Sequence, residues 1–244
     1  MMNIVIPMAG AGSRFVAAGY KKPKPFIDVA GKPMIVRVLE NLACPKANFY
    51  LIARKEHVEA ERELAGKIQK EFKATFILID KLTEGAVCTV LHARKYINND
   101  LPLLLANSDQ LVDIAFGDFA GDCFSRKLDG SIMTFIDRHR DPKWSFAKVD
   151  DNGFVTEARE KVAISQYATV GAYLYSKGRY FVDAAIDMLA ANDRVNNEFY
   201  VCPTYNYAVG EGKKIGIYNI NFEQMHGMGT PEDLNAYLRC LRGA

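Results

Sequence analysis

The 244-residue sequence lacks the long apolar segment and the cysteine spacing that mark membrane-spanning or disulfide-bonded proteins. No apolar run approaches the roughly 20 residues that a bilayer requires. The apolar start is interrupted by Pro7 and two glycines, and it shows neither a basic leader nor a cleavage site. The five cysteines are odd in number and never arranged as Cys-x-x-Cys. We therefore expect a soluble, cytoplasmic protein with reduced thiols, without a disulfide framework or a zinc site.

The sequence also has little excess charge and no low-complexity linker. A formal net charge of +2 implies no broad attraction to nucleic acid or to an anionic membrane, so neither is an expected partner. Hydrophobic residues make up 49% of the chain, which is enough to bury a substantial core. We expect one domain over residues 1–244.

Strand-like and helix-like segments alternate through the first half of the chain. Strands are expected at 3–7, 49–53, 75–79 and 101–106, with a short extended piece at 26–29, and helices at 33–43, 57–72 and 85–96. Such alternation builds a doubly wound, mostly parallel sheet, so the predicted fold class is α/β. The run at 101–106 is too apolar to alternate, as expected for a strand buried on both faces.

The second half contains short strands separated by turn residues. Strands are expected at 131–136, 146–149, 154–156, 169–175 and 214–218, and helices at 178–191, at 204–209 and after a Thr230 cap. Turns such as Asp151-Asn152-Gly153 predict small antiparallel additions to the sheet.

The strongest chemical signal follows the first predicted strand. The chain there reads Met8-Ala9-Gly10-Ala11-Gly12-Ser13-Arg14 and continues to Pro23-Lys24-Pro25. Two glycines let backbone amides approach an anion, and Arg14 and Lys24 add positive charge, so a phosphate site is expected. A dinucleotide-binding loop is disfavoured because Phe15 occupies the place of its third small residue. A P-loop is disfavoured because Pro33 follows Gly31-Lys32.

These segments resemble the signature of the sugar-nucleotide pyrophosphorylases, a family of nucleotidyltransferases that make activated sugars and related headgroups. The family pattern is Gly-x-Gly-Ser/Thr-Arg followed by Pro-Lys-Pro, and Gly10 to Arg14 and Pro23 to Pro25 occupy it. The resemblance implies a Rossmann-like, glycosyltransferase A-type fold, with a nucleotide-binding half over about 1–126 and an acceptor-binding half over about 127–244. It also implies Mg²⁺ as cofactor and precursors of capsule or lipopolysaccharide as products.

Asp109 directly follows the buried strand at 101–106, where a hard cation could be held between protein and triphosphate. The resemblance assigns this carboxylate to magnesium. Many relatives carry a second magnesium carboxylate where this chain has Gly227. Three nearby residues could substitute, or water could complete the coordination; they are Asn221, Glu223 and His226.

The resemblance assigns further residues to the two substrates. Arg14 and Lys24 would act on the phosphates as catalytic groups with Asp109. Nucleotide contacts are expected from Met8, Ala9, Gly10, Gly12, Ser13, Thr83, Gly85 and Ser108. Ala9, where thymidylyl- and guanylyl-transferring relatives often have glycine, favours a pyrimidine nucleotide, CTP or UTP. Acceptor contacts are expected from Lys161, Gly171 and Glu198, although Val162 replaces the proline that often follows the lysine.

The expected partners are a nucleoside triphosphate and a phosphorylated small molecule, with a sugar 1-phosphate favoured, and assembly into a homo-oligomer is compatible with this interpretation. A non-sugar acceptor such as phosphocholine is one alternative. A glycosyltransferase is another, but it would require Asp-x-Asp where the chain reads Ser108-Asp109-Gln110. A catalytically silent nucleotide-binding protein is the third. Pyrophosphate release would distinguish them.

Overall fold

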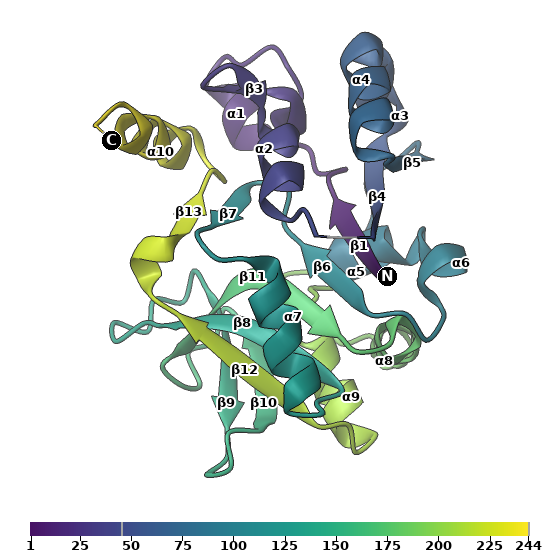
Figure 1. The fold of residues 1–244 in the computed structure, drawn as a ribbon, viewed down its shortest axis with the longest axis vertical. Coiled ribbons are helices and arrows are strands. Elements are labelled where there is room, and N and C mark those ends of the chain that lie inside the picture. Colours follow the sequence, from purple (N-terminus) through teal and green to yellow (C-terminus); the bar gives the residue numbers. More distant parts are fainter. Residues whose placement is uncertain (45, 244) are drawn as a thin grey trace.

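One nine-stranded sheet runs through the computed structural model, which describes residues 1–44 and 46–243 (Figure 1). The strands of this sheet are β1 (Met2–Pro7), β4 (Ala47–Arg54), β5 (Thr75–Ile79), β6 (Leu103–Ala106), β8 (Gly130–Ile136), β9 (Ser145–Val149), β10 (Val155–Glu160), β11 (Tyr167–Tyr175) and β12 (Ile215–Ile220). Two small sheets pair β2 (Asp28–Val29) with β3 (Lys32–Pro33), and β7 (Gln110–Val112) with β13 (Met225–Gly227).

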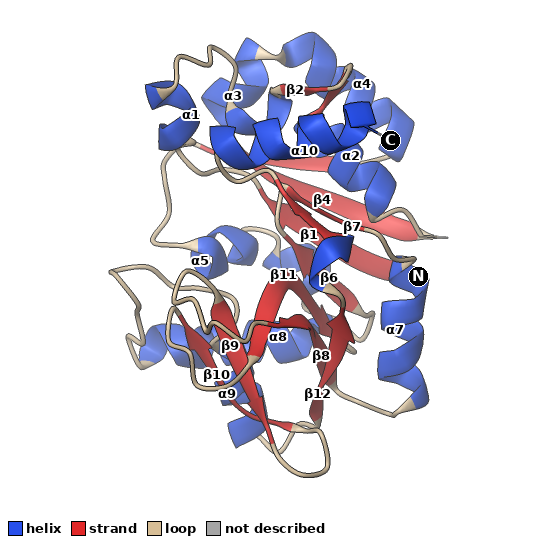
Figure 2. Cartoon of the chain, turned by 90° about the vertical axis from the view of Figure 1, so that its left-hand side faces the viewer, coloured by secondary structure: helices blue, strands red, loops and turns tan. Residues whose placement is uncertain are grey.

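Helices cover both faces of the large sheet (Figure 2). They are α1 (Ser13–Ala17), α2 (Met34–Asn41), α3 (Lys55–Ala60), α4 (Arg62–Phe72), α5 (Ala86–Leu91), α6 (Arg94–Ile97), α7 (Phe116–Ser125), α8 (Gly178–Ala190), α9 (Thr204–Gly210) and α10 (Pro231–Gly243), with single 3₁₀ turns η1 (Lys24–Phe26) and η2 (Phe222–Gln224). Within the described residues, no helix combines the length and apolarity that crossing a membrane requires.

The sheet has a parallel half and a mixed half. Strand β1 pairs in parallel with β4 and β6, and β4 pairs in parallel with β5. Strand β11 then joins β6 in antiparallel orientation, and β8 and β9 pair antiparallel with β11. Strand β12 returns parallel to β8, whereas β10 is antiparallel to β9. The predicted α/β fold with antiparallel additions is confirmed.

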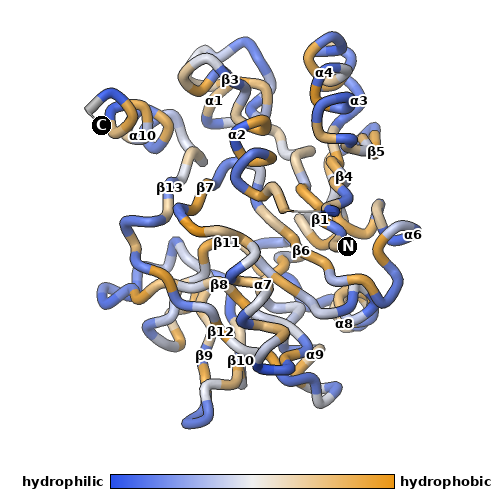
Figure 3. The backbone as a smooth tube through the Cα atoms, viewed as in Figure 1, coloured by the Kyte–Doolittle hydropathy of each residue, from blue (hydrophilic) through white to orange (hydrophobic). Residues whose placement is uncertain are grey.

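Alternate residues of the central strands enter two separate core clusters. Ile4 and Ile6 belong to a cluster that includes apolar residues of α2, α4 and α7, whereas Val5 belongs to one with residues of α5, α8 and α9. Successive side chains of a strand point to opposite faces, so the two clusters are the two covered faces of the sheet. Figure 3 shows apolar colour along β1 and β6 and polar colour at the outer loops.

Two segments that were each predicted as one helix are divided into two helices in the structure. The helix expected at 57–72 is broken at Glu61, whose φ of −120° separates α3 from α4. The helix expected at 85–96 is α5 followed by the four-residue α6, and Gly85, with φ +119°, precedes it as the N-cap. The helix expected at 33–43 is α2, which begins at Met34 because Pro33 is its N-cap rather than its first residue.

Other elements were not predicted. Helix α7 contains Gly117 and Gly121, which lower its intrinsic helix propensity. Helix α1 has only five residues, and β7 and β13 have three each, too short for a periodic pattern to stand out.

Candidate active site

The glycine loop follows β1 and turns sharply into α1. Gly12 has a φ of +61°, in the left-handed region that favours glycine, and a Cβ there would lie 3.2 Å from the Cβ of Lys24. Gly12 therefore lets the glycine loop and the lysine loop approach closely. Gly10 is exposed, and no atom lies within 4 Å of where its Cβ would be, so the backbone is open to a ligand.

A cavity of about 430 Å³ lies beyond the carboxyl ends of β1 and β6, and we call it the nucleotide-side cavity. Its lining includes six of the residues predicted for the nucleotide or the metal, namely Ala9, Gly10, Thr83, Gly85, Ser108 and Asp109. Glu198, predicted for the acceptor, also lines it. The carboxyl ends of parallel strands are where ligands of open α/β sheets bind.

Three predicted nucleotide residues lie on the glycine loop but outside the lining of this cavity. The Met8 side chain is 3% exposed and packs in the core, so only its backbone is available. Gly12 lies beside Lys24, and Ser13 is exposed as the first residue of α1. These three residues belong to the glycine loop but do not line the nucleotide-side cavity.

The second loop of the cavity is held together by its own contacts. Thr83 Oγ1 donates to the carbonyl of Gly85 over 2.9 Å and lies 2.5 Å from Thr89 Oγ1. A Cβ on Gly85 would lie 2.5 Å from both N and O of Phe199. Gly85 is therefore required for the packing of residue 199, in addition to any contact with a base.

Of the three charged side chains predicted as catalytic, Lys24 contacts Asp109, and Arg14 lines a cavity that Asp109 also lines. Lys24 donates to the Asp109 carboxylate in an ion pair, and the two side chains are 19% and 22% exposed. Arg14 is exposed and lines a second cavity of about 610 Å³ together with Asp109. This second cavity, here called the central cavity, also includes Trp144 and the start of α10.

The residues at Asp109 fit a hard divalent cation. The Oδ2 atoms of Asp109 and Asp233 lie 3.3 and 3.8 Å from the point where a Cβ on Gly229 would be. Carboxylate oxygens are the ligands that Mg²⁺ prefers, with water completing the coordination, but the Oδ2 of Asp109 already accepts from Lys24 and the Oδ2 of Asp233 from the Thr230 N–H. Among residues 1–44 and 46–243, no group of three or more His, Cys, Asp or Glu side chains is placed to hold a metal.

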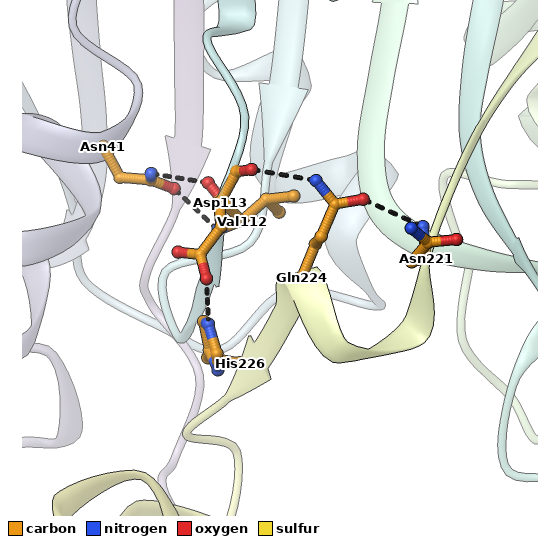
Figure 4. Close-up of polar contacts among 6 residues, drawn as sticks. All are labelled: Asn41, Val112, Asp113, Asn221, Gln224 and His226. Carbon is orange, nitrogen blue, oxygen red and sulfur yellow. Dashed lines mark hydrogen bonds and ion pairs between the residues drawn. The ribbon is translucent and has the colours of Figure 1, made fainter. Parts of the chain in front are cut away.

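The three residues predicted as alternative metal ligands are placed differently. Asn221 and Glu223 line a neighbouring cavity of about 670 Å³ rather than the cavities that contain Asp109. His226 lines the central cavity, but its Nε2 lies 2.7 Å from the carboxylate of Asp113. Figure 4 shows His226 directed at Asp113, and Gln224 joined to both Asp113 and Asn221. These contacts tie η2 and β13 to the end of β7.

Lys161, the lysine predicted to bind the acceptor, is held by a tyrosine. Lys161 Nζ donates to Tyr200 Oη over 3.0 Å and lies 5.0 Å from the centre of the Tyr200 ring. The hydrogen bond with Tyr200 raises the pKa of Lys161, against a lowering by partial burial. The backbone N–H of Lys161 donates to the carbonyl of Trp144 over 3.1 Å. The lysine is therefore charged and restrained.

Gly171 lies against Asn107, at the end of the strand that precedes Asp109. Its φ is +91°, and a Cβ there would lie 2.2 Å from Nδ2 of Asn107. The Asn107 N–H also donates to the Gly171 carbonyl over 3.2 Å. Gly171 thereby positions a residue that lines both the nucleotide-side and the central cavity.

Sequence reasoning did not identify Asp233 or the role of Tyr200. Asp233 is in the first turn of α10, where its carboxylate accepts the Thr230 N–H and its own N–H donates to Thr230 Oγ1, both over 3.1 Å. These bonds confirm the predicted Thr230 cap, and such a cap was a sufficient explanation for an acidic residue there. No sequence pattern indicates that the same carboxylate faces Asp109.

Solved structures share this fold. A nucleoside-diphosphate-sugar pyrophosphorylase from Vibrio cholerae RC9 superimposes with a TM-score of 0.81 at 24% identity, over 97% of this chain and 99% of that one. A UDP-glucose pyrophosphorylase solved with UDP-glucose has a TM-score of 0.79 at 15% identity, over 100% of this chain and 99% of that one. At these identities the likeness shows the fold.

Curated relatives match parts of the chain. The catalytic subunit beta of mannose-1-phosphate guanylyltransferase from Dictyostelium discoideum is 25% identical over 187 residues, 72% of this chain and 50% of that protein. A CMP-5'-(3-aminopropyl)phosphonate synthase from Streptomyces rubellomurinus is 32% identical over 104 residues, 42% of this chain and 17% of that protein. The chain thus spans half or less of the length of these relatives.

The match to a family model covers most of the chain. The model described as Nucleotidyl transferase matches residues 4–211, which include the glycine loop, Asp109, Lys161 and Glu198. The chain belongs to the nucleotidyl transferase family.

Proposed function

We propose that this protein joins a nucleoside triphosphate to a phosphorylated acceptor, releasing pyrophosphate and an acceptor linked to the nucleotide by a diphosphate. The observation that carries the proposal is the ion pair of Lys24 with Asp109, a residue that lines both the nucleotide-side cavity and the central cavity, which Arg14 also lines. Nucleotide binding is assigned to residues 1–126 and acceptor binding to residues 127–244. The chain contributes a base slot, a cationic phosphate site and a carboxylate for a metal.

The proposed reaction needs no general base. An oxygen of the acceptor phosphate attacks the α-phosphorus of the triphosphate. The bond between that phosphorus and the oxygen that bridges the α- and β-phosphates breaks, and its electron pair leaves with pyrophosphate. A phosphate oxygen is already ionised at neutral pH. The barrier lies in bringing two anions together and in the charge that builds on the bridging oxygens. Arg14 binds the β- and γ-phosphates, Lys24 stabilises charge at the α-phosphate, and Lys161 binds the incoming phosphate.

Asp109 is the proposed Mg²⁺ ligand. When bound, the metal supplies positive charge that offsets the negative charge of the triphosphate. In the structure, Lys24 neutralises the same carboxylate. The Lys24 ammonium has three donors, so a bond to Asp109 leaves two for the phosphates of the nucleotide.

We favour CTP or UTP as the nucleotide and a sugar 1-phosphate as the acceptor. Ala9 and Gly10 line one side of the nucleotide-side cavity and Gly85 lines another, so backbone groups face the base. Ala9 is 4% exposed and packs in the same core cluster as Val5, so the proposed exclusion of a purine depends on a close approach of the base to the backbone of this loop. Relatives whose names indicate guanylyl transfer and CMP transfer both match this chain, so GTP is the competing nucleotide and a phosphonate or phosphocholine the competing acceptor.

The test is a matrix of pyrophosphate-release assays. CTP, UTP, dTTP, ATP and GTP are each combined with glucose 1-phosphate, mannose 1-phosphate, N-acetylglucosamine 1-phosphate and phosphocholine, with Mg²⁺ present. We expect pyrophosphate only when both substrates are present. The better pyrimidine should exceed either purine by at least ~10-fold in kcat/KM, because a steric clash and an unpaired polar edge each cost about 1–3 kcal/mol. A purine with the highest value would contradict the base assignment, and pyrophosphate without acceptor would indicate hydrolysis.

A further inference from the structure

Residues 198–200 form a short segment, here called the bridging segment. It is hydrogen-bonded to residues 82–87, which include the second loop of the nucleotide-side cavity and are here called the nucleotide-side loop. The Phe199 N–H donates to the Glu84 carbonyl over 2.8 Å, and the Val87 N–H donates to the Phe199 carbonyl over 3.1 Å. The Phe199 side chain is 2% exposed, and its backbone fills the space that a Gly85 Cβ would need. The bridging segment therefore cannot move without moving the loop that lines the nucleotide-side cavity.

The two ends of the bridging segment lie beside different parts of the candidate site. Glu198 lines the nucleotide-side cavity, whereas Tyr200 contacts Lys161 through both its hydroxyl and its ring. Burial raises the pKa of the Tyr200 phenol, and the Glu198 carboxylate adds to that rise against the effect of Lys161. The phenol consequently stays neutral and accepts from the lysine through its oxygen.

Lys161 is also restrained at its backbone. Its φ of +57° is unusual for a residue other than glycine, and its N–H is bonded to Trp144. An unrestrained lysine has four flexible side-chain bonds and would lose much rotamer entropy on binding a phosphate. An ammonium group has three donors, so a bond to Tyr200 leaves two for a phosphate.

We propose that Tyr200 is a positioning residue that holds the Lys161 ammonium in place for the acceptor phosphate, and that the bridging segment links this position to the nucleotide-side loop. The inference rests on the proposed function, because it assumes that Lys161 binds the acceptor. Tyr200 acts through Lys161. Its loss should weaken acceptor binding while leaving nucleotide binding intact.

The first variant is Tyr200→Phe, which removes the hydroxyl and keeps the ring beneath the ammonium. The KM for the acceptor should rise about 5- to 10-fold, within the range expected for losing one partly exposed hydrogen bond of ordinary strength. The KM for the nucleotide and the kcat at saturating acceptor should change less than about 2-fold. Tyr180→Phe is the matched control, because Lys213 Nζ lies 4.6 Å from the Tyr180 ring on the surface formed by α8 and α9.

A second variant tests the link to the loop from outside both substrate sites. Arg194 lies 4.2 Å above the Phe199 ring and forms a 2.6 Å ion pair with Glu84, so it clamps the bridging segment to the loop. Arg194→Met should raise the acceptor KM about 2- to 3-fold. In the double variant with Tyr200→Phe the two effects should be less than multiplicative, because both act on one unit.

Binding of inorganic phosphate, measured by calorimetry, gives a readout that does not depend on turnover. Lys161→Ala should lose phosphate binding at this position, which identifies the binding that depends on Lys161. Tyr200→Phe should weaken that same binding by the factor by which it raises the acceptor KM. Unchanged phosphate binding, or equal rises in both KM values, would overturn the inference. If the wild type releases no pyrophosphate with any substrate pair, the proposed function fails, and the calorimetric comparison still decides whether Tyr200 positions Lys161 for a phosphate.

Discussion

Lys24 and Asp109 neutralise each other in the structure, although they have opposite proposed roles. Each side chain is about four-fifths buried, so leaving either charge without a partner would be costly. Incoming substrate offers each a replacement, a phosphate for the lysine and a cation for the carboxylate. The ion pair therefore keeps the site preformed between turnovers.

Replacing Lys24 tests its role in stabilising the transition state. Lys24→Ala should lower kcat by ~10²-fold or more, as for other charges that face developing negative charge. Lys21→Ala, an exposed lysine of the same loop, is the control and should stay near wild type. Circular dichroism should show that both variants remain folded. A Lys24→Ala enzyme with near wild-type turnover would remove this residue from the mechanism.

Replacing Asp109 tests the metal assignment. Asp109→Ala should abolish the Mg²⁺-dependent activity and weaken binding of Mn²⁺ followed by electron paramagnetic resonance, because the carboxylate supplies a ligand oxygen. Asp113→Ala removes an exposed carboxylate that contacts only His226 among the polar side chains described, and should bind Mn²⁺ normally. If Asp109→Ala keeps the wild-type metal response, Asp109 is a structural residue.

At the scale of elements, the site depends on close approaches between loops that follow different strands. Gly171 on β11 accommodates Asn107 at the end of β6, and Gly85 accommodates the backbone of residue 199. The sequence predicted that Gly85 and Gly171 belong to the site. It could not predict these packing partners, because Asn107 lies 64 positions from Gly171 and residue 199 lies 114 positions from Gly85 along the chain.

Gly171→Ala should destabilise the fold. The new Cβ would meet Asn107 at 2.2 Å and would occupy a φ of +91°, which together should cost about 1–3 kcal/mol of unfolding free energy. Gly117→Ala, at an exposed position of α7 with no atom within 4 Å of the new Cβ, should instead add about 0.5–1 kcal/mol. Urea denaturation measures both values. If the Gly171→Ala variant is as stable as the wild type, the Asn107 side chain moves aside and the backbone at residue 171 tolerates an alanine.

Glu160, at the end of β10, should make stability depend on pH. Burial raises its pKa above the ordinary value of 4.5, against the Ser145 hydrogen bond and Lys161. The folded state therefore holds this proton to higher pH than the unfolded state, and the resulting stabilisation is lost as pH rises from 4.5 through the raised pKa. The Glu160→Gln variant has no such proton.

The unfolding free energy of Glu160→Gln relative to wild type should consequently increase across this window and then level off. Denaturation at intervals between about pH 4 and about pH 8 checks the expectation. A difference that is constant with pH would show that Glu160 titrates alike in both states. Glu157→Gln, at a partly exposed position of the same strand, is the matched control.

At the scale of the whole molecule, the parallel half carries the nucleotide-side loops and the mixed half carries Lys161 and Gly171. The alternating elements at 49–53, 75–79 and 101–106 were predictable because each is a short apolar run, although β6 is buried throughout and the edge strand β5 only in part. Helix α7 was not, because packing against the sheet stabilises a segment with two glycines. Asp233 was not predicted at the site, because its proximity to Asp109 arises only when α10 folds beside β7.

The most direct test of the account follows the α-phosphorus. CTP or UTP labelled at that atom is incubated with Mg²⁺ and the acceptor that gives the highest rate in the pyrophosphate assay. We expect the label to move into a diphosphate-linked nucleotide-acceptor product, with one unlabelled pyrophosphate released for each product formed. Label that remains in the triphosphate, or that appears in free nucleoside monophosphate at the same rate without acceptor, would contradict nucleotidyl transfer as the function of this site.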